Sequence, residues 1–542
     1  MACTPWLLWL FFAAPPADLV VVNARVYTMD ASRPVVSSLA IKDGRIVAAG
    51  ADASAHTGPG TRRIDARGAT IVPGFVDSHG HMSGLGQSLA LPDFRTARSV
   101  EAIAETVRKE AAVRRPGEWI TGRNWDQTNW GGELPTEGPL SRAAPDHPVI
   151  LTRVDGHAAW VNRKALEVAG ITAATPDPPG GKILRAPSGE PTGVLIDAAQ
   201  GLVRRRMPQA GASDALLHLE RAARECARAG ITSVHDAGVD GETLAAYRAL
   251  IEQGKLPVRV YAMIGGEGEL WRRYLKSGPE TGERLTVRSV KLLADGAMGS
   301  RGAAFLAPYF DDPGNSGLLM LSREQIESVA RRAVERGFQV NVHAIGDRAN
   351  RTVLEAFGAV LRGKNEHRFR VEHAQVVAPE DFALFAKYSV IASVQATHAT
   401  SDMRWVETRI GRERAKGAYA WRTFTNLGVP VANGSDSPVE PPGPIRGFYA
   451  AITRQDENGN PPGGWFPEQR MTREEALRSW TAGGAYAAFE ENAKGSLSPG
   501  KLADFVMLSA DIMQVPPAEI LKTRVVMTVV GGEVVYQEQR QP

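Results

Sequence analysis

Two histidines separated by one residue, His79 and His81, are the strongest chemical signal in this sequence. They follow an apolar run, residues 71–76, of the length and composition of a buried strand. Side chains at positions i and i+2 of a strand point to the same face, so both imidazoles leave the strand end in one direction. The spacing predicts a metal site, although a polar strand end with two unrelated histidines would show the same pattern.

Two further histidines, His343 and His373, also follow apolar runs and precede loops. Either one alone is more typical of a partly buried histidine that has found a hydrogen bond. Four histidines gathered at three strand ends instead favour metal binding. Nitrogen and oxygen donors without thiolates suit Zn²⁺, with Mn²⁺, Fe²⁺ and Co²⁺ as other candidates.

Asp436 lies in a short loop, residues 433–438, that follows another apolar run. A carboxylate beside a metal can bind the ion and also accept the proton of a water molecule whose pKa the ion lowers. We therefore predict that Asp436 is both a metal ligand and the catalytic base. The alternative is that it caps the turn formed by Ser437 and Pro438.

Lys291 interrupts an otherwise apolar strand, residues 287–293. Burying an ammonium group is costly unless the charge is paired or removed. One solution is reaction of the amine with carbon dioxide to give a carbamate, whose oxygens can bridge two metal ions. The alternatives are a salt bridge to Asp295 or Asp236, or a side chain whose stem is buried and whose amine reaches solvent.

These residues need a scaffold that gathers strand ends, and the chain between residues 71 and 494 predicts one. Strands alternate there with helical segments, which indicates a (β/α)₈ barrel of the TIM type, an α/β fold with its active site at the carboxyl ends of the strands. The eight predicted strands are residues 71–76, 230–234, 257–264, 287–293, 338–342, 369–372, 390–395 and 429–434.

Three segments lie outside this count. Residues 18–70 and 495–542 are short alternating runs joined by hairpin signals, which predicts a small composite β-sandwich built from both ends of the chain. Residues 95–209 are an insertion after strand 1, at the face of the barrel where loops determine substrate choice. We interpret most of its tryptophans as the core of the insertion itself.

Composition narrows the class of protein. The chain has 542 residues, 43% of them hydrophobic and 23% charged, with a net charge of +3 from scattered residues, which gives no indication of a nucleic-acid partner. Two cysteines exclude a disulfide framework. Residues 1–17 form an apolar leader that is too short to span a bilayer and resembles a signal peptide without its basic residues, so both export and a cytoplasmic location stay open.

Three longer stretches of the sequence are specific enough to indicate a protein family: residues 153–162, 291–301 and 434–439. Together with the strand-end residues, they make the chain resemble the amidohydrolase superfamily, in particular the amidohydrolase-3 type that includes N-substituted formamide deformylase. The resemblance covers nearly the whole chain after the leader. It implies a barrel with a composite β-sandwich, and hydrolysis of an amide-type C–N bond by metal-activated water.

The resemblance also implies roles for particular residues. It assigns the metal site to His79, His81, His343, His373 and Asp436, and makes a carbamylated Lys291 with one or two ions plausible. Arg153 and His157 in the insertion become candidates for substrate contact, and Asp295 for orienting Lys291 or its loop; each could instead fix loop structure.

The expected partner is a small-molecule amide, such as an N-substituted formamide or another N-acyl compound, and a homo-oligomer stays open. The rival functions are a deaminase of ring amines with a single metal and a non-catalytic scaffold.

Overall fold

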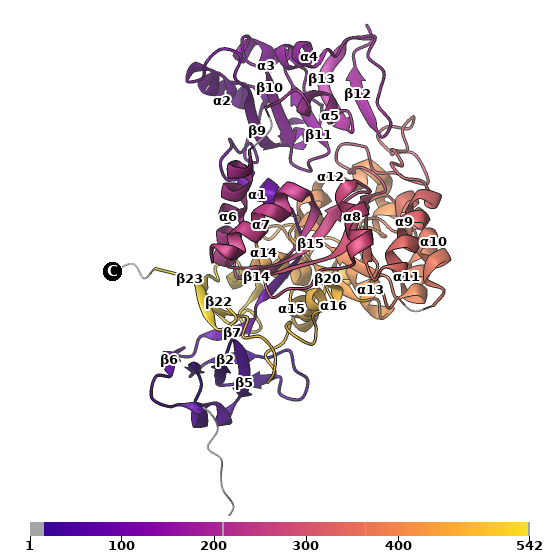
Figure 1. Ribbon diagram of the computed structural model, residues 1–542. Helices are drawn as coiled ribbons and strands as arrows, with labels where there is room; N and C mark the ends of the chain where they lie inside the picture. Colours follow the sequence, from indigo (N-terminus) through magenta and orange to yellow (C-terminus); the bar gives the residue numbers. More distant parts are fainter. Residues whose placement is uncertain (1–15, 209–210, 364, 540–542) are drawn as a thin grey trace, which may run out of the picture.

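The structure is a computed structural model that describes residues 16–208, 211–363 and 365–539. Only Pro16 and Ala17 of the predicted leader fall within these ranges, and the rest of that segment lies outside the described residues. No helix in these ranges combines the length and apolar character needed to cross a membrane. Figure 1 shows a central barrel, with a lobe rich in strands at one end and small β-sheets at the other.

The central sheet has eight parallel strands, and the prediction of an α/β barrel is confirmed. An isolated parallel bridge between Gly80 and Ser437 brings the first and last strands together. Almost every residue of these strands is buried, as expected where helices cover the outside of a parallel sheet. Around the barrel the strands are β8 (Phe75–Gly80), β14 (Ile231–Val239), β15 (Arg259–Gly265), β16 (Leu285–Leu293), β17 (Gln339–Ala344), β18 (Arg370–His373), β19 (Ile391–Val394) and β20 (Val431–Asn433).

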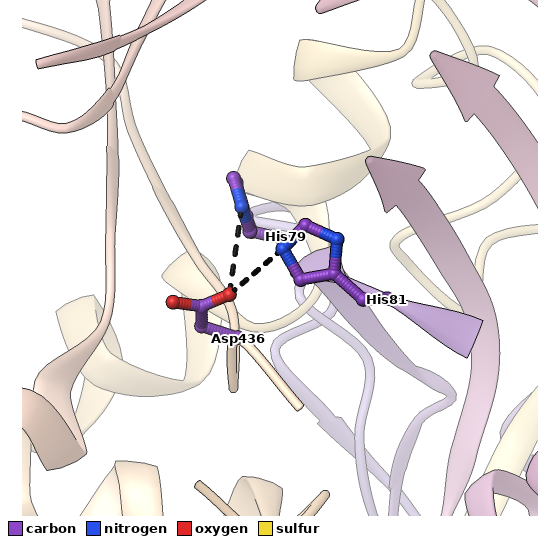
Figure 2. Close-up of side chains that lie close together, drawn as sticks. All are labelled: His79, His81 and Asp436. Carbon is purple, nitrogen blue, oxygen red and sulfur yellow. Dashed lines mark ion pairs between the residues drawn. The ribbon is translucent and has the colours of Figure 1, made fainter. Parts of the chain in front are cut away.

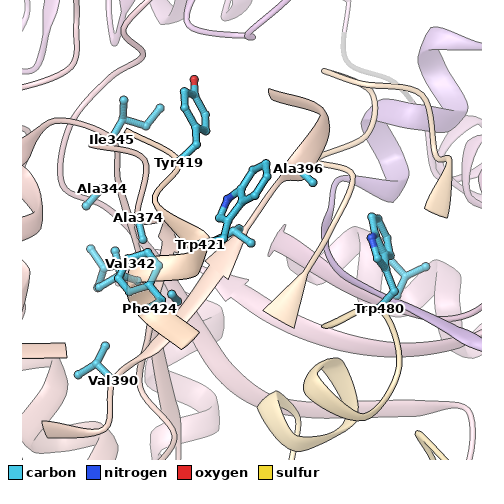
Figure 3. Packing of buried hydrophobic residues seen from close by; sticks show 14 of the residues in the cluster. Val342, Ala344, Ile345, Ala374, Val390, Ala396, Tyr419, Trp421, Phe424 and Trp480 are labelled. Atoms are coloured by element: carbon cyan, nitrogen blue, oxygen red, sulfur yellow. The ribbon is translucent and has the colours of Figure 1, made fainter. Parts of the chain in front are cut away.

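Helices surround this sheet and pack an apolar face onto it. Figure 3 shows part of the resulting core, which includes Val342, Val390, Trp421 and Phe424. The helices that follow the barrel strands are α1 (Met82–Ser88), α6 (Ala212–Arg228), α7 (Gly241–Glu252), α8 (Glu269–Ser277), α9 (Arg323–Glu335), α10 (Asp347–Leu361), α11 (Phe382–Tyr388), α12 (Ala396–Ala415), α13 (Trp421–Asn426), α14 (Pro444–Thr453), α15 (Arg473–Ser479) and α16 (Ala482–Ala487).

Two small sheets lie at the base of the barrel, and one of them joins strands from both ends of the chain. One is β5 (Arg45–Ala49), β4 (Leu39–Lys42), β1 (Leu19–Val22) and β6 (Arg62–Asp65). The other is β23 (Glu533–Gln537), β22 (Val525–Val530), β21 (Phe505–Leu508), β7 (Thr70–Pro73), β2 (Arg25–Tyr27) and β3 (Val35–Val36), with α17 (Pro517–Ile520) before β22.

The start of the barrel differs from the prediction. Residues 71–76 were expected to form one strand, but β7 belongs to a basal sheet and the barrel begins one residue after Gly74. A side chain at Gly74 would lie 2.2 Å from Oγ1 of Thr232, so the chain needs a glycine where it passes between the sheets. Both strands are buried, so the run is apolar throughout. A search for apolar runs therefore cannot detect the break between them.

A buried ion pair fixes the barrel on its base. Nε and Nη2 of Arg259, at the start of β15, lie 2.8 and 3.0 Å from the carboxylate oxygens of Asp504. Both side chains are about 3% exposed, and two parallel hydrogen bonds of this kind also set orientation. Burial would raise the pKa of Asp504, but Arg259 outweighs it and holds that pKa below its usual value.

The insertion forms the lobe at the other end of the barrel (Figure 1). Its core contains Trp125 and Trp160, both fully buried and packed edge to face, in line with the interpretation of its tryptophans. The sheet of the insertion runs β12 (Gly181–Arg185), β13 (Pro191–Asp197), β11 (Ala158–Val161), β10 (Val149–Arg153) and β9 (Ile120–Trp125). Its helices are α2 (Val100–Ala112), α3 (Gly138–Ala143), α4 (Arg163–Ala169) and α5 (Gln200–Arg204).

Candidate metal centre

The two histidines of the first barrel strand converge on one carboxylate. Nε2 of His81 lies 3.2 Å and Nε2 of His79 lies 3.6 Å from Oδ1 of Asp436, as Figure 2 shows. That oxygen is buried and accepts no hydrogen bond from any described residue. Three potential ligand atoms facing one point, with an unsatisfied buried oxygen among them, fit a divalent cation better than any partner that the chain itself offers.

The backbone holds these three residues in register. The amide of Asp436 donates to the carbonyl of His79, and the amide of His81 donates to the carbonyl of Ser437. The N···O distance is 2.7 Å in both hydrogen bonds. Asp77, two residues before His79, accepts hydrogen bonds from the amide and the hydroxyl of Ser435, with donor–acceptor distances of 2.8 and 2.5 Å. The first strand and the loop after the last strand therefore position the site together.

The remaining ring nitrogens are also oriented. Nδ1 of His79 lies 2.5 Å from the carboxylate of Glu372, and Nδ1 of His81 lies 2.8 Å from the carbonyl oxygen of Ala237. These contacts fix the proton on Nδ1 and leave the lone pair of each Nε2 facing the site. Carboxylate and carbonyl partners of this kind commonly orient the histidines that bind metals.

A second group shares the same aspartate. His373, His398 and Asp436 place potential ligand atoms within 4.8 Å of one another. Nδ1 of His373 lies 2.7 Å from Oε1 of Gln395, and Nε2 of His398 lies 3.7 Å from Oδ2 of Asp436. Like Oδ1 of Asp436, Nε2 of His398 is buried without a hydrogen bond to a described residue. Asp436 thus lies between two potential ligand groups.

Three buried histidines of the barrel, His79, His343 and His373, are neutral at physiological pH. Burial lowers the pKa of His79 to about 4, with Lys291 adding to the effect and Glu372 opposing it. Burial also lowers the pKa values of His343 and His373 well below the usual range. Neutral imidazole is the form that binds a metal ion, so the environment prepares these rings as ligands.

Asp436 keeps its charge despite its burial. Desolvation would raise its pKa, but the close approach of the imidazoles of His81, His79 and His373 outweighs it, and its pKa lies well below the usual value. An ionised carboxylate beside neutral imidazoles is a donor set that can attract a divalent ion.

Lys291 lies inside the same site. Its Nζ is 3.1 Å from Nε2 of His79, and its side chain is 5% exposed. The salt bridges to Asp295 or Asp236 considered from the sequence do not form between these described residues; Asp236 instead accepts hydrogen bonds from Tyr247 and the amide of Met82. Burial lowers the pKa of Lys291 to about 8, against the opposing charges of Glu372 and Asp436, which makes the neutral amine accessible.

His343 is close to the site but oriented differently. Its ring centroid is 4.5 Å from that of His373, yet its Nε2 faces the carbonyl oxygen of Gly296 at 3.3 Å. It belongs to neither ligand group in this conformation. Asp295 lies 3.5 Å from the same nitrogen and accepts backbone hydrogen bonds from Ala304, Ile345 and Gly346. Asp295 therefore ties the loops around His343 together and does not contact Lys291.

The two insertion residues proposed for substrate contact, Arg153 and His157, differ in where their side chains reach. Arg153 is buried and donates to Asp126, Asp155 and Gln127, which uses its guanidinium within the insertion. His157 reaches across to the barrel, with its ring centroid 5.1 Å from that of His343. Its Nδ1 lies 2.6 Å from Asp197; burial alone would lower the pKa of His157, but Asp197 and other carboxylates raise it to about 9.

Both ligand groups open into one cavity of about 1030 Å³ between the barrel and the insertion. The barrel contributes His81, Lys291, His373 and Asp436 to its wall, and the insertion contributes Arg123 and His157, among others. A cavity of this size, lined by polar groups that converge on one point, is suited to a small organic molecule.

Sequence reasoning missed Glu372, Gln395 and His398. His398 lies in the first turn of α12, next to a predicted strand end, so its position was an available signal. Glu372 directly precedes His373, and neighbouring residues of a strand normally point to opposite faces. His373 has a left-handed backbone, with φ of 73°, and both side chains reach the site. No sequence pattern reveals that local turn.

Comparison with known proteins agrees with this geometry. The model of the amidohydrolase family matches residues 62–536 of the chain. The chain belongs to the amidohydrolase family. The structure of this amidohydrolase resembles that of an uncharacterized metal-dependent hydrolase from Pyrococcus furiosus, with a TM-score of 0.72 and 32% identity over 92% of this chain and 100% of that one. The protein is therefore a metal-dependent hydrolase of the amidohydrolase family.

Two curated relatives span almost the whole amidohydrolase. Protein LONG AFTER FAR-RED 3 of Arabidopsis thaliana is 35% identical over 96% of this chain and 92% of its own length. N-substituted formamide deformylase of Arthrobacter pascens is 27% identical over 96% of this chain and 98% of its own. The first name states no reaction, and the second names one.

Proposed function

We propose that this amidohydrolase hydrolyses the amide-type C–N bond of a small molecule, an N-substituted formamide or a related N-acyl compound. The observation that carries the proposal is the convergence of His79 and His81 on the unpartnered carboxylate of Asp436 at the wall of the cavity. The full-length similarity to an N-substituted formamide deformylase supports this choice of bond.

His79, His81 and Asp436 would hold one ion, and His373 and His398 could contribute to a second. Zn²⁺ suits this donor set, and Mn²⁺, Fe²⁺ or Co²⁺ would also fit. When bound, such an ion polarises a carbonyl oxygen and brings the pKa of water towards neutrality. Asp436 is placed to accept the proton of the attacking water and to return it to the leaving nitrogen.

Lys291 fits a carbamate in this scheme. Its buried amine has no carboxylate partner among the described residues, and the neutral amine attacks carbon dioxide. A nitrogen–carbon bond forms, the amine proton is released, and an anionic group replaces a buried cation. Lys291 would then carry a negative charge instead of a positive one, which favours the binding of a cation in this site.

The test is a comparison of metal-depleted and zinc-reconstituted protein on N-substituted formamides, N-acyl amino acids and cyclic amides. We expect the free amine to appear only with metal present, and to be lost in His81→Ala but kept in His218→Gln, a change on the outer helix α6. Ammonia released from ring amines, without amide hydrolysis, would replace this proposal with a deaminase. No turnover of either class by zinc-saturated protein would favour a scaffold.

A further inference from the structure

Arg123 is a partly buried arginine in the wall of the cavity. Arg123 lies on β9 of the insertion, and its side chain forms no hydrogen bond or ion pair with any described residue. Its Nε is buried and unsatisfied. Leaving a partly buried guanidinium without a carboxylate in hydrogen-bonding contact is costly, so a bound group that pairs with it would be favoured.

Apart from Asp436 at the metal centre, most carboxylates of the cavity wall are engaged with other partners. Within the described part of the chain, Asp126 and Asp155 pair with Arg153, Asp197 with His157, and Glu457 with Arg446. Asp402 accepts a hydrogen bond from Tyr419, and Glu440 accepts one from Ser401. The exposed Arg98 can be hydrated at the rim, whereas Arg123 is partly buried in the cavity wall.

The groups around Arg123 strengthen its positive field. Arg204 donates only to the neutral oxygens of Thr152 and Gln200, over 2.8 and 3.1 Å. Arg95 donates to two backbone carbonyls and lies 3.9 Å from the half-exposed Asp93. Burial first, and then Arg204 and Arg95, lower the pKa of Arg123 to about 10, so it stays charged at neutral pH.

Arg123 is also close to the metal centre. A Cβ placed on Gly84 would lie 3.7 Å from Nη1 of Arg123, 3.7 Å from Cβ of His81 and 3.5 Å from Cδ of Pro438. The guanidinium therefore stands beside the turn after His81 and the loop that carries Asp436. A small molecule whose reacting bond lies at that carboxylate could place a second group on Arg123.

We propose that Arg123 binds a carboxylate of the substrate, so that the amide hydrolysed at the metal centre belongs to a molecule that also carries a carboxylate. This proposal rests on the proposed function for its reaction. A carboxylate is the expected anion because its two oxygens match the planar fork of a single guanidinium. The nearby charges of Asp93 and Asp436 disfavour a group with two negative charges.

The test uses two formamides that differ only in a carboxylate: N-formylphenylalanine and N-formyl-2-phenylethylamine. With zinc-loaded protein, we expect the carboxylate to raise kcat/KM. Arg123→Gln should lower kcat/KM for N-formylphenylalanine by roughly 10- to 100-fold, the usual cost of losing a hydrogen bond between charged groups, and should change the neutral compound by less than about 3-fold. Arg123→Lys should give an intermediate value, because it keeps the charge and loses the fork.

Arg108→Gln is the matched control, since it removes the same charge from an exposed helix of the same insertion. Thermal unfolding of each variant shows whether the fold is kept. If both formamides are hydrolysed and Arg123→Gln lowers both equally or neither, the carboxylate site is wrong and the proposed function stands.

If neither formamide is hydrolysed, the proposed function fails for this pair and binding decides the role of Arg123. Isothermal titration calorimetry of zinc-loaded protein with 3-phenylpropanoate and 3-phenylpropan-1-ol gives that answer. Binding of the acid at least tenfold weaker in Arg123→Gln than in the unchanged protein supports the site. Equal binding in both proteins, or no binding in either, overturns it.

Discussion

His373 of the barrel and His157 of the insertion line the same cavity in opposite charge states. Burial lowers the pKa of His79 to about 4, so its imidazole is neutral at physiological pH. The pKa of His157 rises to about 9 because Asp197 and neighbouring carboxylates outweigh burial. The barrel side of the cavity thus presents neutral donors around one free carboxylate, and the insertion side presents charges that are mostly paired with each other.

This difference separates two tasks. Unsatisfied atoms at the barrel mouth, such as Oδ1 of Asp436 and Nε2 of His398, are suited to a cation and to chemistry. In the insertion, buried ion pairs such as Arg153 with Asp126 form the wall, whereas Arg123 has no side-chain partner among the described residues. We infer that the barrel determines the reaction and the insertion determines which molecule reaches it.

The largest effect should follow from changing the carboxylate shared by both ligand groups. Asp436→Asn removes the proposed base, and general-base catalysis commonly contributes about 10²- to 10⁴-fold, so we expect kcat to fall by about 10³-fold. The measurement is kcat for amide hydrolysis together with the zinc content of the variant. Turnover within tenfold of the unchanged protein would show that Asp436 is not the base.

Lys291→Ala should lower metal content from two ions to one, because it removes the proposed bridging carbamate. Lys494→Met is a control at another buried lysine, which pairs with Glu490 and Ser233 away from the site, and should keep both ions. Elemental analysis counts the metal, and a carbamate carbon signal from protein incubated with ¹³C-bicarbonate should be absent only from Lys291→Ala. Equal metal content in both variants would argue against the carbamate.

Glu372→Gln tests whether the barrel histidines depend on their buried partners. The change replaces the carboxylate that accepts the Nδ1 proton of His79, and losing such a partner typically weakens metal affinity by about 10- to 100-fold. Competition with a zinc chelator measures this affinity. Glu380→Gln, at an exposed carboxylate, should leave the affinity unchanged; a loss of similar size there would remove the special role of Glu372.

The smallest effect concerns the insertion side. The folded-state pKa of His157 is raised from 6.5 to about 9, so protonation stabilises the folded state fully below pH 6.5 and progressively less as pH rises to 9. The free energy of unfolding should therefore fall in this window by at most about 1.4 kcal/mol per pH unit. Urea unfolding at several pH values measures this pH dependence of the free energy of unfolding, and the same measurement on Asp197→Asn serves as the reference. Identical pH profiles for the two proteins would contradict the pairing.

Sequence alone could predict the barrel, because its strands are apolar runs and its chemistry lies at their ends. His79, His81 and Asp436 were found in this way, and the structure brings them together. The contacts that complete the site depend on distant partners. Glu372 contacts His79 from 293 residues away, and Lys291 faces a histidine instead of a carboxylate. Periodicity contains no information about such pairs.

The insertion was harder for a different reason. Its charged residues could each have contacted substrate, and only the three-dimensional arrangement shows which are already paired. Arg153, a candidate from the sequence, donates to three neighbouring side chains, whereas Arg123, which gave no signal in the sequence, has no side-chain partner among the described residues. The prediction of the insertion as a site of selectivity stays open until its substrate is known.

Anomalous diffraction at the zinc edge from crystals of zinc-loaded protein tests the central claim most directly. The account predicts a peak within bonding distance of Nε2 of His79, Nε2 of His81 and Oδ1 of Asp436, with extra density on Nζ of Lys291. Zinc-saturated crystals without a peak at these three atoms would contradict it.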